Sequence, residues 1–553
     1  MQHHDDDQKQ AERGDAESLS RLNAKPVSEA KPAPGLLRSS GVVGAMTMLS
    51  RVLGLARDIV FARVIGADAL ADAFFVAFKI PNFFRRLFAE GAFSQAFVPV
   101  LGEYREKGSP AAVKALIDSV AGVLGSVLIT LTLIVVLASP LVTGLFAFGF
   151  WLDYPDKFAA ASSMLRITFP YLLLISLTGL AGAVLNSYDR FAVPAFTPVL
   201  LNVTLIAAAL LVAPWFDTPV FALAWGVLVA GVVQLLFQLP FLARIHMVPS
   251  PRVDWRDDGV RRILKLMAPA IFGVSVSQIN LLLDTMIASF LPTGSISWLY
   301  YSDRLSELPL GVFGVAIATV ILPSLSRQHA AAAPDVFNRT LNWALRMILL
   351  IAVPASVALI ILAEPILLSL FYYGEVITAR DMAMATLSLR AYALGLIAFM
   401  LIKVLAPGYY ARQDMTTPVR IGVIALVTNM GLNIAFAVPL HIYWGIGHVG
   451  LALATSLAAM LNAGLLFSGL YKRNVFTPEV GWRRFALTLM FASGVMALLL
   501  FGYDYYLNDW SLWAWWQRGM WLAIICGSGA MAYAICLFLG GLRYSHIRHQ
   551  ANG

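Results

Sequence analysis

The chain has 553 residues, of which 59% are hydrophobic and 13% are charged, whereas roughly 25% of the residues in soluble domains are charged. This composition excludes an ordinary soluble protein and places most of the chain in a membrane. The formal net charge of +8 is expected from membrane topology alone, so we predict no nucleic-acid partner.

Residues 1–38 are polar, mixed in charge and contain several Pro and Ala residues, which predicts a disordered cytoplasmic tail. Beyond this tail, apolar runs long enough to cross a hydrocarbon core of about 30 Å recur along the chain. We predict an all-α polytopic membrane protein with fourteen transmembrane helices, at approximately residues 41–64, 70–101, 113–146, 158–187, 195–213, 218–243, 262–290, 296–326, 341–371, 381–409, 417–439, 447–471, 482–503 and 513–541.

Basic residues alternate between the connections that join these helices. The base-rich set includes the connections that hold Arg105, Arg190, Arg244 and Arg327, whereas "APWFDTP" and "LPTGS" in the opposite set have neither Lys nor Arg. Cytoplasmic loops of membrane proteins carry the excess of Lys and Arg. The alternation therefore favours fourteen spans with both termini in the cytoplasm.

Three short motifs occur twice in the same order. Leu165-Arg166 matches Leu389-Arg390, the triplet YDR at 188–190 matches YAR at 410–412, and Thr197-Pro198 matches Thr417-Pro418. Six predicted helices separate equivalent points, so the two copies have the same orientation in the membrane. We predict two pseudo-repeated six-helix lobes, residues 39–247 and 258–471, with a substrate between them. Residues 480–541 form two extra helices outside the repeat.

Ionisable residues concentrate in three of the predicted helices, although such residues are expensive in a membrane and usually face an interior cavity. The first helix carries Arg51, Arg57, Asp58 and Arg63. The second carries Asn82, Arg85, Arg86 and Glu90, and the eighth carries Ser297, Arg304 and Glu307. One interpretation is interhelical ion pairs and arginines that snorkel to the interface, which we expect for Arg63. The other is a cavity that binds an anion.

Four arginines favour the cavity because they come from both lobes: Arg51, Arg57, Arg85 and Arg304. Guanidinium groups grip phosphate with paired hydrogen bonds, which predicts a phosphate-bearing substrate. The sequence has no phosphate-binding loop of the nucleotide hydrolases, no HExxH motif and no Cys/His metal cluster. We therefore expect a transporter that uses an existing gradient or potential, and not an enzyme.

Four stretches are long enough to be specific: "SRVLGLARD", "GADALADAFFVAFKIPNFFRRLFAEGAFSQAFVPVL", "APAIFGVSVSQINLLLDT" and "SWLYYSDRLSELPLGVFGVAIATVILPSLS". They closely resemble the MurJ (MviN) lipid II flippases of the multidrug/oligosaccharidyl-lipid/polysaccharide exporter superfamily, from about residue 38 to 541. The resemblance implies translocation of the undecaprenyl-pyrophosphate-linked peptidoglycan precursor from the inner to the outer leaflet of the bacterial inner membrane, by alternating access.

The resemblance also implies a central cationic cavity formed by Arg51, Arg57, Arg85 and Arg304. Supporting roles are implied for Asp72, Asn82, Ser297 and Glu307. The last two helices would line a groove for the polyprenyl tail. The expected partners are lipid II, membrane lipids and the peptidoglycan synthesis machinery, and no catalytic residue is expected.

Energy coupling has two interpretations. Asp284 in the seventh predicted helix, and Asn429 and Asn433 in the eleventh, carry oxygens that can coordinate a sodium ion, and the resemblance implies such a site. Alternatively, Asp284 is a protonated or hydrogen-bonded aspartate and the membrane potential alone drives transport, without a cofactor.

Two other functions stay open. A cation-coupled exporter of drugs or other lipid-linked oligosaccharides would share the superfamily and its architecture. A polytopic glycan transferase or ligase would use similar lipids, but it needs acidic or histidine groups in the outer loops, and those loops are short here and lack them.

Overall fold

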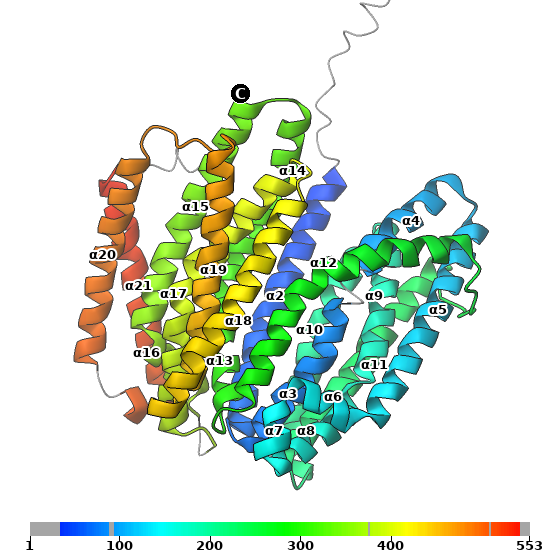
Figure 1. Ribbon diagram of the computed structural model, residues 1–553, viewed down its shortest axis with the longest axis horizontal. Coiled ribbons are helices and arrows are strands. Elements are labelled where there is room, and N and C mark those ends of the chain that lie inside the picture. The colour runs from blue at the N-terminus through cyan, green and yellow to red at the C-terminus, as the bar shows by residue number, and fades with distance from the viewer. Residues whose placement is uncertain (1–33, 88–92, 374–375, 508–509, 542–553) are drawn as a thin grey trace, which may run out of the picture.

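The computed structural model describes residues 34–87, 93–373, 376–507 and 510–541, and the regular elements in these ranges are all helices, joined by turns and irregular connections (Figure 1). The first helix, α2 (Pro34–Ile65), begins inside the segment 1–38 that we predicted as a tail. Proline is favoured in the first turn of a helix, since its fixed φ suits the helix and its missing N–H has no partner there. The rest of the predicted tail lies outside the described residues.

The N-lobe, as we use the term, runs from α2 to α11. Its further helices are α3 (Ala69–Phe84), α4 (Ser94–Lys107), α5 (Pro110–Leu137), α6 (Ser139–Phe146), α7 (Phe148–Asp153), α8 (Pro155–Thr168), α9 (Tyr171–Ser187), α10 (Ala192–Ala207) and α11 (Pro219–Arg244). A π-helical turn, η2 (Ala208–Val212), and a 3₁₀ turn, η3 (Ala213–Trp215), extend α10.

The C-lobe runs from α12 to α19. It comprises α12 (Asp258–Ala288), α13 (Ser295–Pro309), the π-helical turn η4 (Leu310–Gly314), α14 (Val315–Ala330), α15 (Pro334–Ile361), α16 (Ala363–Phe371), α17 (Ala379–Tyr410), α18 (Thr416–Trp444) and α19 (Gly447–Lys472). The extra pair is α20 (Trp482–Tyr506) and α21 (Trp515–Leu539), which follow each other through the short turn η5 (Trp510–Leu512).

Eleven helical segments among the described residues are long and apolar enough to cross a membrane, which makes this a multi-pass membrane protein. They coincide with eleven of the fourteen predicted spans. The other three predicted spans, 41–64, 70–101 and 262–290, fall on α2, on α3 with α4, and on α12. The charged residues of these segments lower their hydropathy, so the count of fourteen stays a prediction.

The repeated Leu-Arg motif has a matching structural role in both lobes. Arg166 of α8 donates from Nε to the Ser139 hydroxyl over 2.7 Å, at the junction of α5 and α6. Arg390 of α17 donates from Nε to the Ile360 carbonyl over 3.2 Å, beside the junction of α15 and α16. A helix break leaves backbone groups without intrahelical partners. Each arginine therefore supports the equivalent break in its own lobe.

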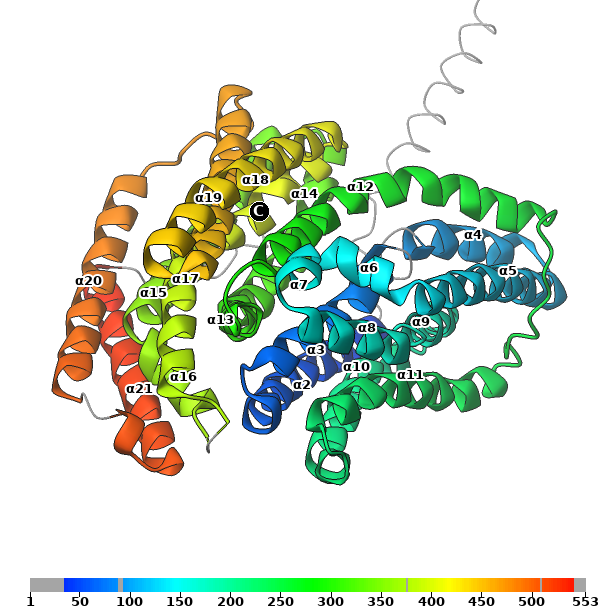
Figure 2. The ribbon, with the colours of Figure 1, turned by 60° about the horizontal axis from the view of Figure 1, so that its bottom comes forward.

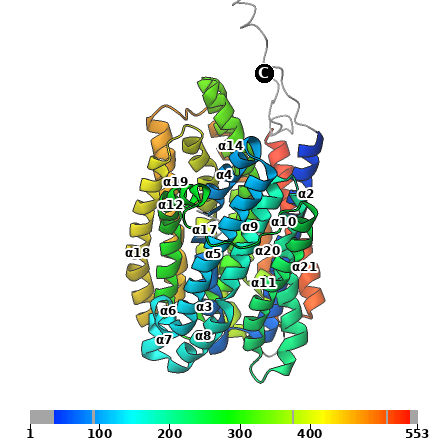
Figure 3. The ribbon, with the colours of Figure 1, turned by 90° about the vertical axis from the view of Figure 1, so that its right-hand side faces the viewer.

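The two lobes lie side by side, and α12 crosses between them (Figures 1 and 2). The first half of α12 packs on α4 and α5, where Arg262 pairs with Glu103 over 2.6 Å, whereas α18 of the C-lobe also packs against α12. Because α12 contacts both lobes, the predicted lobe boundary at residue 258 stays a prediction. Figure 3 shows α6, α7 and α8 at one end of the molecule, with α4 and α14 towards the other.

The extra helices pack on α15 and α16 at the side of the C-lobe (Figure 2). The buried guanidinium of Arg518 in α21 donates from Nη1 to the carbonyls of Leu368 and Tyr372, both over 2.8 Å, and so satisfies the end of α16. Near the opposite end, Asn342 of α15 accepts from Trp482 Nε1 over 2.6 Å. Side-chain contacts thus attach the pair at both ends.

Candidate substrate-binding site

A buried carboxylate joins arginines from the two lobes. Asp58 of α2 has no exposed side-chain surface, and its Oδ1 accepts from Nη2 of the neighbouring Arg57 over 2.7 Å. Its Oδ2 accepts from Arg304 Nε, which comes from α13 of the C-lobe, also over 2.7 Å. Tyr300 donates its hydroxyl to Asp58 Oδ1 over 2.8 Å. We call Arg57, Asp58, Tyr300 and Arg304 the arginine cluster.

The members of this cluster differ in their access to the space between the lobes. Arg57 is 3% exposed and is further held by Asn202 of α10, whose Oδ1 accepts from Nη1 over 3.1 Å. The Arg304 side chain is 35% exposed and donates from Nη1 to Glu307 Oε2 over 3.3 Å. Arg57 Nη2 also donates to the Tyr300 hydroxyl of the C-lobe over 3.1 Å. Arg304 is therefore the more accessible of the two arginines, whereas Arg57 is enclosed by residues of both lobes.

A second contact joins the lobes at one end of the molecule. Asp72, in the first turn of α3, accepts from the backbone N–H and hydroxyl of Ser297 over 3.0 and 2.7 Å, and from the Gly294 N–H over 2.8 Å. Within its own lobe, Asp72 pairs with Lys157 of α8 over 3.3 Å. We call this set of four residues the outer gate contact, because it lies at the end opposite to the base-rich connections.

Asp72 and Ser297, which we expected to support the substrate cavity, have a different environment in the structure. Asp72 is 1% exposed and Ser297 is fully buried, and the two are bonded to each other. In this conformation they connect the lobes, and their polar atoms do not face the space between them. Tyr301 adds to the same closure by donating its hydroxyl to the Gly66 carbonyl over 2.8 Å.

The remaining predicted arginines lie apart from this buried cluster. Arg51 is half-buried on α2, and within the described residues it forms no ion pair and no hydrogen bond. Arg85 donates from Nε to Asn82 Oδ1 over 3.2 Å at the end of α3. Arg63 is exposed near the end of α2, as expected for an interfacial residue. Glu90, which we placed in a stripe with Arg86, lies outside the described residues.

Four charged residues near the lobe interface were missed by the sequence reasoning: Asp58 as the shared counterion, Lys79, Lys157 and Asp303. Asp303 is exposed although it lies in the middle of α13. Lys79 of α3 lies within electrostatic reach of Asp303 and Asp284. The sequence signal that could have found two of them was spacing. Lys79 lies three residues before Asn82 and so on the same face of the helix, and Asp303 directly precedes Arg304.

The predicted cation ligands do come together. Asp284 of α12 accepts from the Asn433 amide over 2.6 Å and from the Asn429 amide over 3.2 Å, both on α18. Asn280, one turn earlier on α12, donates to the other carboxylate oxygen over 3.1 Å. The amide oxygens of Asn429 and Asn433 are buried without a partner. This donor set, one carboxylate and three carboxamides, offers the oxygen ligands that a hard cation takes.

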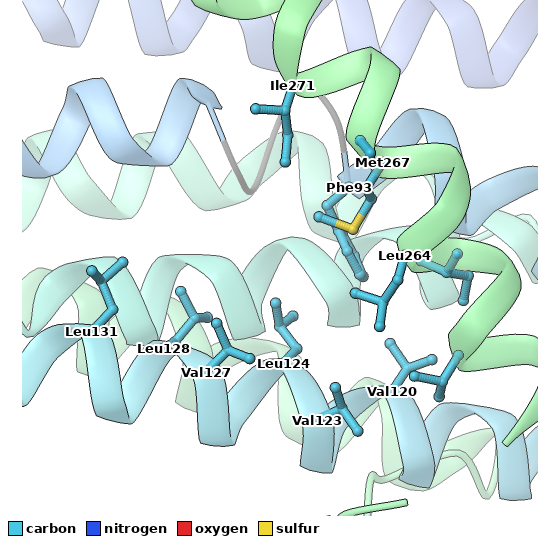
Figure 4. A pocket seen from close by; sticks show the side chains of 13 residues that line it. Phe93, Val120, Val123, Leu124, Val127, Leu128, Leu131, Leu264, Met267 and Ile271 are labelled. Carbon is cyan, nitrogen blue, oxygen red and sulfur yellow. The ribbon is translucent and has the colours of Figure 1, made fainter. Parts of the chain in front are cut away.

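An apolar cavity of about 260 Å³ lies apart from these polar groups, between α5 and the first half of α12 (Figure 4). Its lining is hydrophobic throughout: Phe93, Val120, Val123, Leu124, Val127, Leu128, Leu131, Val260, Ile263, Leu264, Met267, Ala268 and Ile271. The cavity offers no donor to a phosphate, so it is not the place where charged groups bind.

Comparisons with known proteins agree in pointing to one family. The family model described as "Lipid II flippase MurJ" matches residues 61–516. A "Probable lipid II flippase MurJ" of Vibrio cholerae is 50% identical over 521 residues, which cover 93% of this chain and 98% of that protein. The "Lipid II flippase MurJ" of Burkholderia cenocepacia is 46% identical over 469 residues, which cover 84% and 89%.

Solved structures show the same relationship in the fold. The structure titled "Lipid II flippase MurJ, inward closed conformation" superposes with a TM-score of 0.75 at 28% identity, over 90% of this chain and 98% of that one. An inward-facing multidrug transporter of the MATE family has a TM-score of 0.61 at 15% identity, over 78% and 98% of the two chains, which is a likeness of fold alone.

Proposed function

The chain belongs to the MurJ family of lipid II flippases, and we propose that the arginines between its lobes hold the pyrophosphate of lipid II during translocation. The protein is a membrane transporter that moves this peptidoglycan precursor from the inner to the outer leaflet. We infer that it resides in the bacterial inner membrane with both termini in the cytoplasm, because the base-rich connections all lie on one side.

The observation that carries the site assignment is the side chain of Arg304, which is 35% exposed. It is linked to the N-lobe through Asp58, and its exposed part would be accessible to a ligand between the lobes. A pyrophosphate there would accept paired hydrogen bonds from Arg304 and from Arg51, which has no acidic partner among the described residues. Asn82, Arg85 and Glu307 complete the proposed polar surface.

We propose alternating access of the two lobes as the mechanism. The outer gate contact and the arginine cluster close the lobes at the outer end, which leaves the cytoplasmic side as the route of entry. A bound pyrophosphate would compete with Asp58 for Arg304. Because the Asp58–Arg304 pair joins the two lobes, this competition would weaken the outer closure and couple binding to opening.

We propose that the lipid tail stays outside the polar path, against α20 and α21. These helices carry exposed apolar side chains along their length, including Leu487, Met490, Phe491 and Ile535. A chain that ends near Pro478 should still insert its two lobes but should fail to move lipid-linked substrate. Full flipping by such a chain, at a normal membrane level, would contradict the groove.

For energy coupling we propose a sodium ion held by Asp284, Asn429 and Asn433, with Asn280 as a fourth ligand. The support is the two buried amide oxygens without partners, which could turn towards a cation. The membrane potential alone is the alternative, and no other cofactor is proposed. Transport in this scheme involves no covalent step, so we assign no catalytic residue.

A cation-coupled exporter of drugs or other lipid-linked oligosaccharides is the second candidate. The proposed sodium site favours it, because such an exporter needs a coupling cation. The deciding experiment is depletion of the protein in its own cell. Lipid II should accumulate in the inner leaflet while its synthesis continues. Unchanged leaflet distribution would remove the flippase assignment and leave the exporter.

A further inference from the structure

We propose that Gly311 positions Arg51, and that Arg51 and Lys403, which both lie against the π-helical turn η4, form an entry subsite for the lipid II pyrophosphate. This subsite would lie on the cytoplasmic side of the arginine cluster. The inference rests on the proposed function, since it assumes that lipid II enters between the lobes.

The turn η4 interrupts the α-helical pattern between α13 and α14. Its sequence, Leu310–Gly314, follows Pro309 and places glycines at its second and last positions. Proline cannot donate a backbone hydrogen bond, and π-helical turns within α-helices occur often at functional sites. The turn therefore interrupts the regular helix at a place where a neighbouring group can approach the backbone closely.

The close neighbour at Gly311 is the guanidinium of Arg51, from the opposite lobe. A Cβ atom at position 311 would lie 2.5 Å from Arg51 Cζ and 3.0 Å from Nη2, inside the contact distance of real side chains. The backbone at Gly311 does not have a positive φ, so the absence of a side chain matters here for the space that it leaves to the Arg51 head group and not for conformation. Any side chain at this position must displace the arginine head group.

Lys403 of α17 approaches the same turn from the C-lobe. Its Cγ lies 3.6 Å from the position a Cβ would take on Gly314. Two glycines three residues apart on a helix place such positions roughly 5–6 Å from each other. Within the described residues, neither Lys403 nor Arg51 forms an ion pair. Two unpaired cations in a membrane interior are costly unless water or an anion reaches them.

The place of this pair along the helices suggests its role. Arg51 precedes Arg57 by six residues, and Gly311 follows Arg304 by seven, which correspond to about 9 and 10 Å along their helices. The two displacements run in the same direction, away from the outer gate contact. A pyrophosphate that enters from the cytoplasm would therefore meet Arg51 and Lys403 before it reaches Arg304.

The test measures binding of lipid II to the full-length protein in nanodiscs, with flipping in proteoliposomes as the second readout. Gly311→Ala should weaken binding on the order of tenfold, and Lys403→Gln should weaken it by at least severalfold. Gly431→Ala is the matched control, because a Cβ there meets nothing within 4 Å. If Lys403 only extends to the membrane surface, Lys403→Gln will bind normally and the subsite is wrong.

A double-mutant cycle tests the positioning role of Gly311 directly. If the added methyl group acts through Arg51, then Arg51→Ala in the Gly311→Ala background should cause little further loss. If the losses of binding caused by the two substitutions simply add, Gly311 does not act by positioning Arg51. If the wild-type protein neither binds nor flips lipid II, the proposed function itself fails and the subsite fails with it. If the wild type is active and Gly311→Ala matches Gly431→Ala, only this inference is wrong.

Discussion

Lys157 donates to Asp72 over 3.3 Å inside the N-lobe, and their side chains are only 4% and 1% exposed. Three further donors to Asp72, all at Gly294 and Ser297, come from the other lobe. When the outer gate opens, these three bonds must break, whereas Lys157 can stay with Asp72. Lys157 thus gives the buried Asp72 a partner that does not depend on the contact between the lobes.

Replacing Lys157 with Met should lower the stability of the folded protein, because a buried carboxylate without its counterion is unfavourable by several kcal/mol. Asp72→Asn should be harmful for the converse reason, since it leaves Lys157 buried and unpaired. The double variant should lie nearer to wild type than either single variant. Thermal unfolding of the purified variants in detergent measures these losses, and additive effects of the two changes would contradict this account.

Arg304 bridges two carboxylates with one guanidinium, since Nε donates to Asp58 and Nη1 to Glu307. A lysine keeps the charge but lacks the planar fork that makes both bonds at once. Arg304→Lys and Arg57→Lys should therefore reduce flipping, although the protein still inserts. Complementation of flippase-depleted cells, with the membrane level of each variant checked, tests this. Arg63→Lys should complement normally, and equal growth of all three would show that charge alone suffices.

Asp284 decides between the two modes of energy coupling. If a sodium ion binds it, transport into vesicles should fall when sodium is replaced by potassium, and Asp284→Asn should remove that dependence. Asp335→Asn, an exposed acid at the start of α15, is the control. Transport that is insensitive both to sodium and to Asp284→Asn would leave the membrane potential as the driving force.

Asp414, in the connection between α17 and α18, gives a pH-dependent contribution to stability. Hydrogen bonds from the hydroxyl and the backbone N–H of Thr417, together with Arg473, lower the pKa of Asp414 below its usual 3.8. The folded state therefore favours the charged form, so the stabilisation is complete above pH 3.8 and is lost as the pH falls below that value. Asp414→Asn should lower the stability only slightly at pH 7, because these bonds lose their charge but solvent already screens the exposed Arg473.

Thermal unfolding of both proteins in detergent at pH 7 and below pH 3.8 measures this difference. It should shrink as the pH falls below 3.8 and should vanish only where the wild-type carboxyl group is protonated in the folded state as well, because the pKa in that state lies below 3.8. A difference that is unchanged between the two pH values would show that the Asp414 charge is not involved.

The sequence predicted the helices well because apolar runs and their polar connections are local features. The Leu-Arg repeat likewise has the same role at Arg166 and Arg390. The counterions could not be predicted in this way. Asp58 adjoins Arg57 in the sequence, but its bond to Arg304 spans 246 positions and depends on how the lobes dock. For the same reason, Lys157 gave no signal as the partner of Asp72.

The central claim is that arginines between the lobes bind the head group of lipid II. The most direct measurement is the flipping rate of labelled lipid II in proteoliposomes that contain the purified protein with Arg51, Arg57, Arg85 and Arg304 all changed to Ala. We expect this variant to insert and to lose flipping, while Arg63→Ala flips as the wild type does. Wild-type flipping by the fourfold variant would contradict the account, because these arginines would then serve the fold and not the substrate.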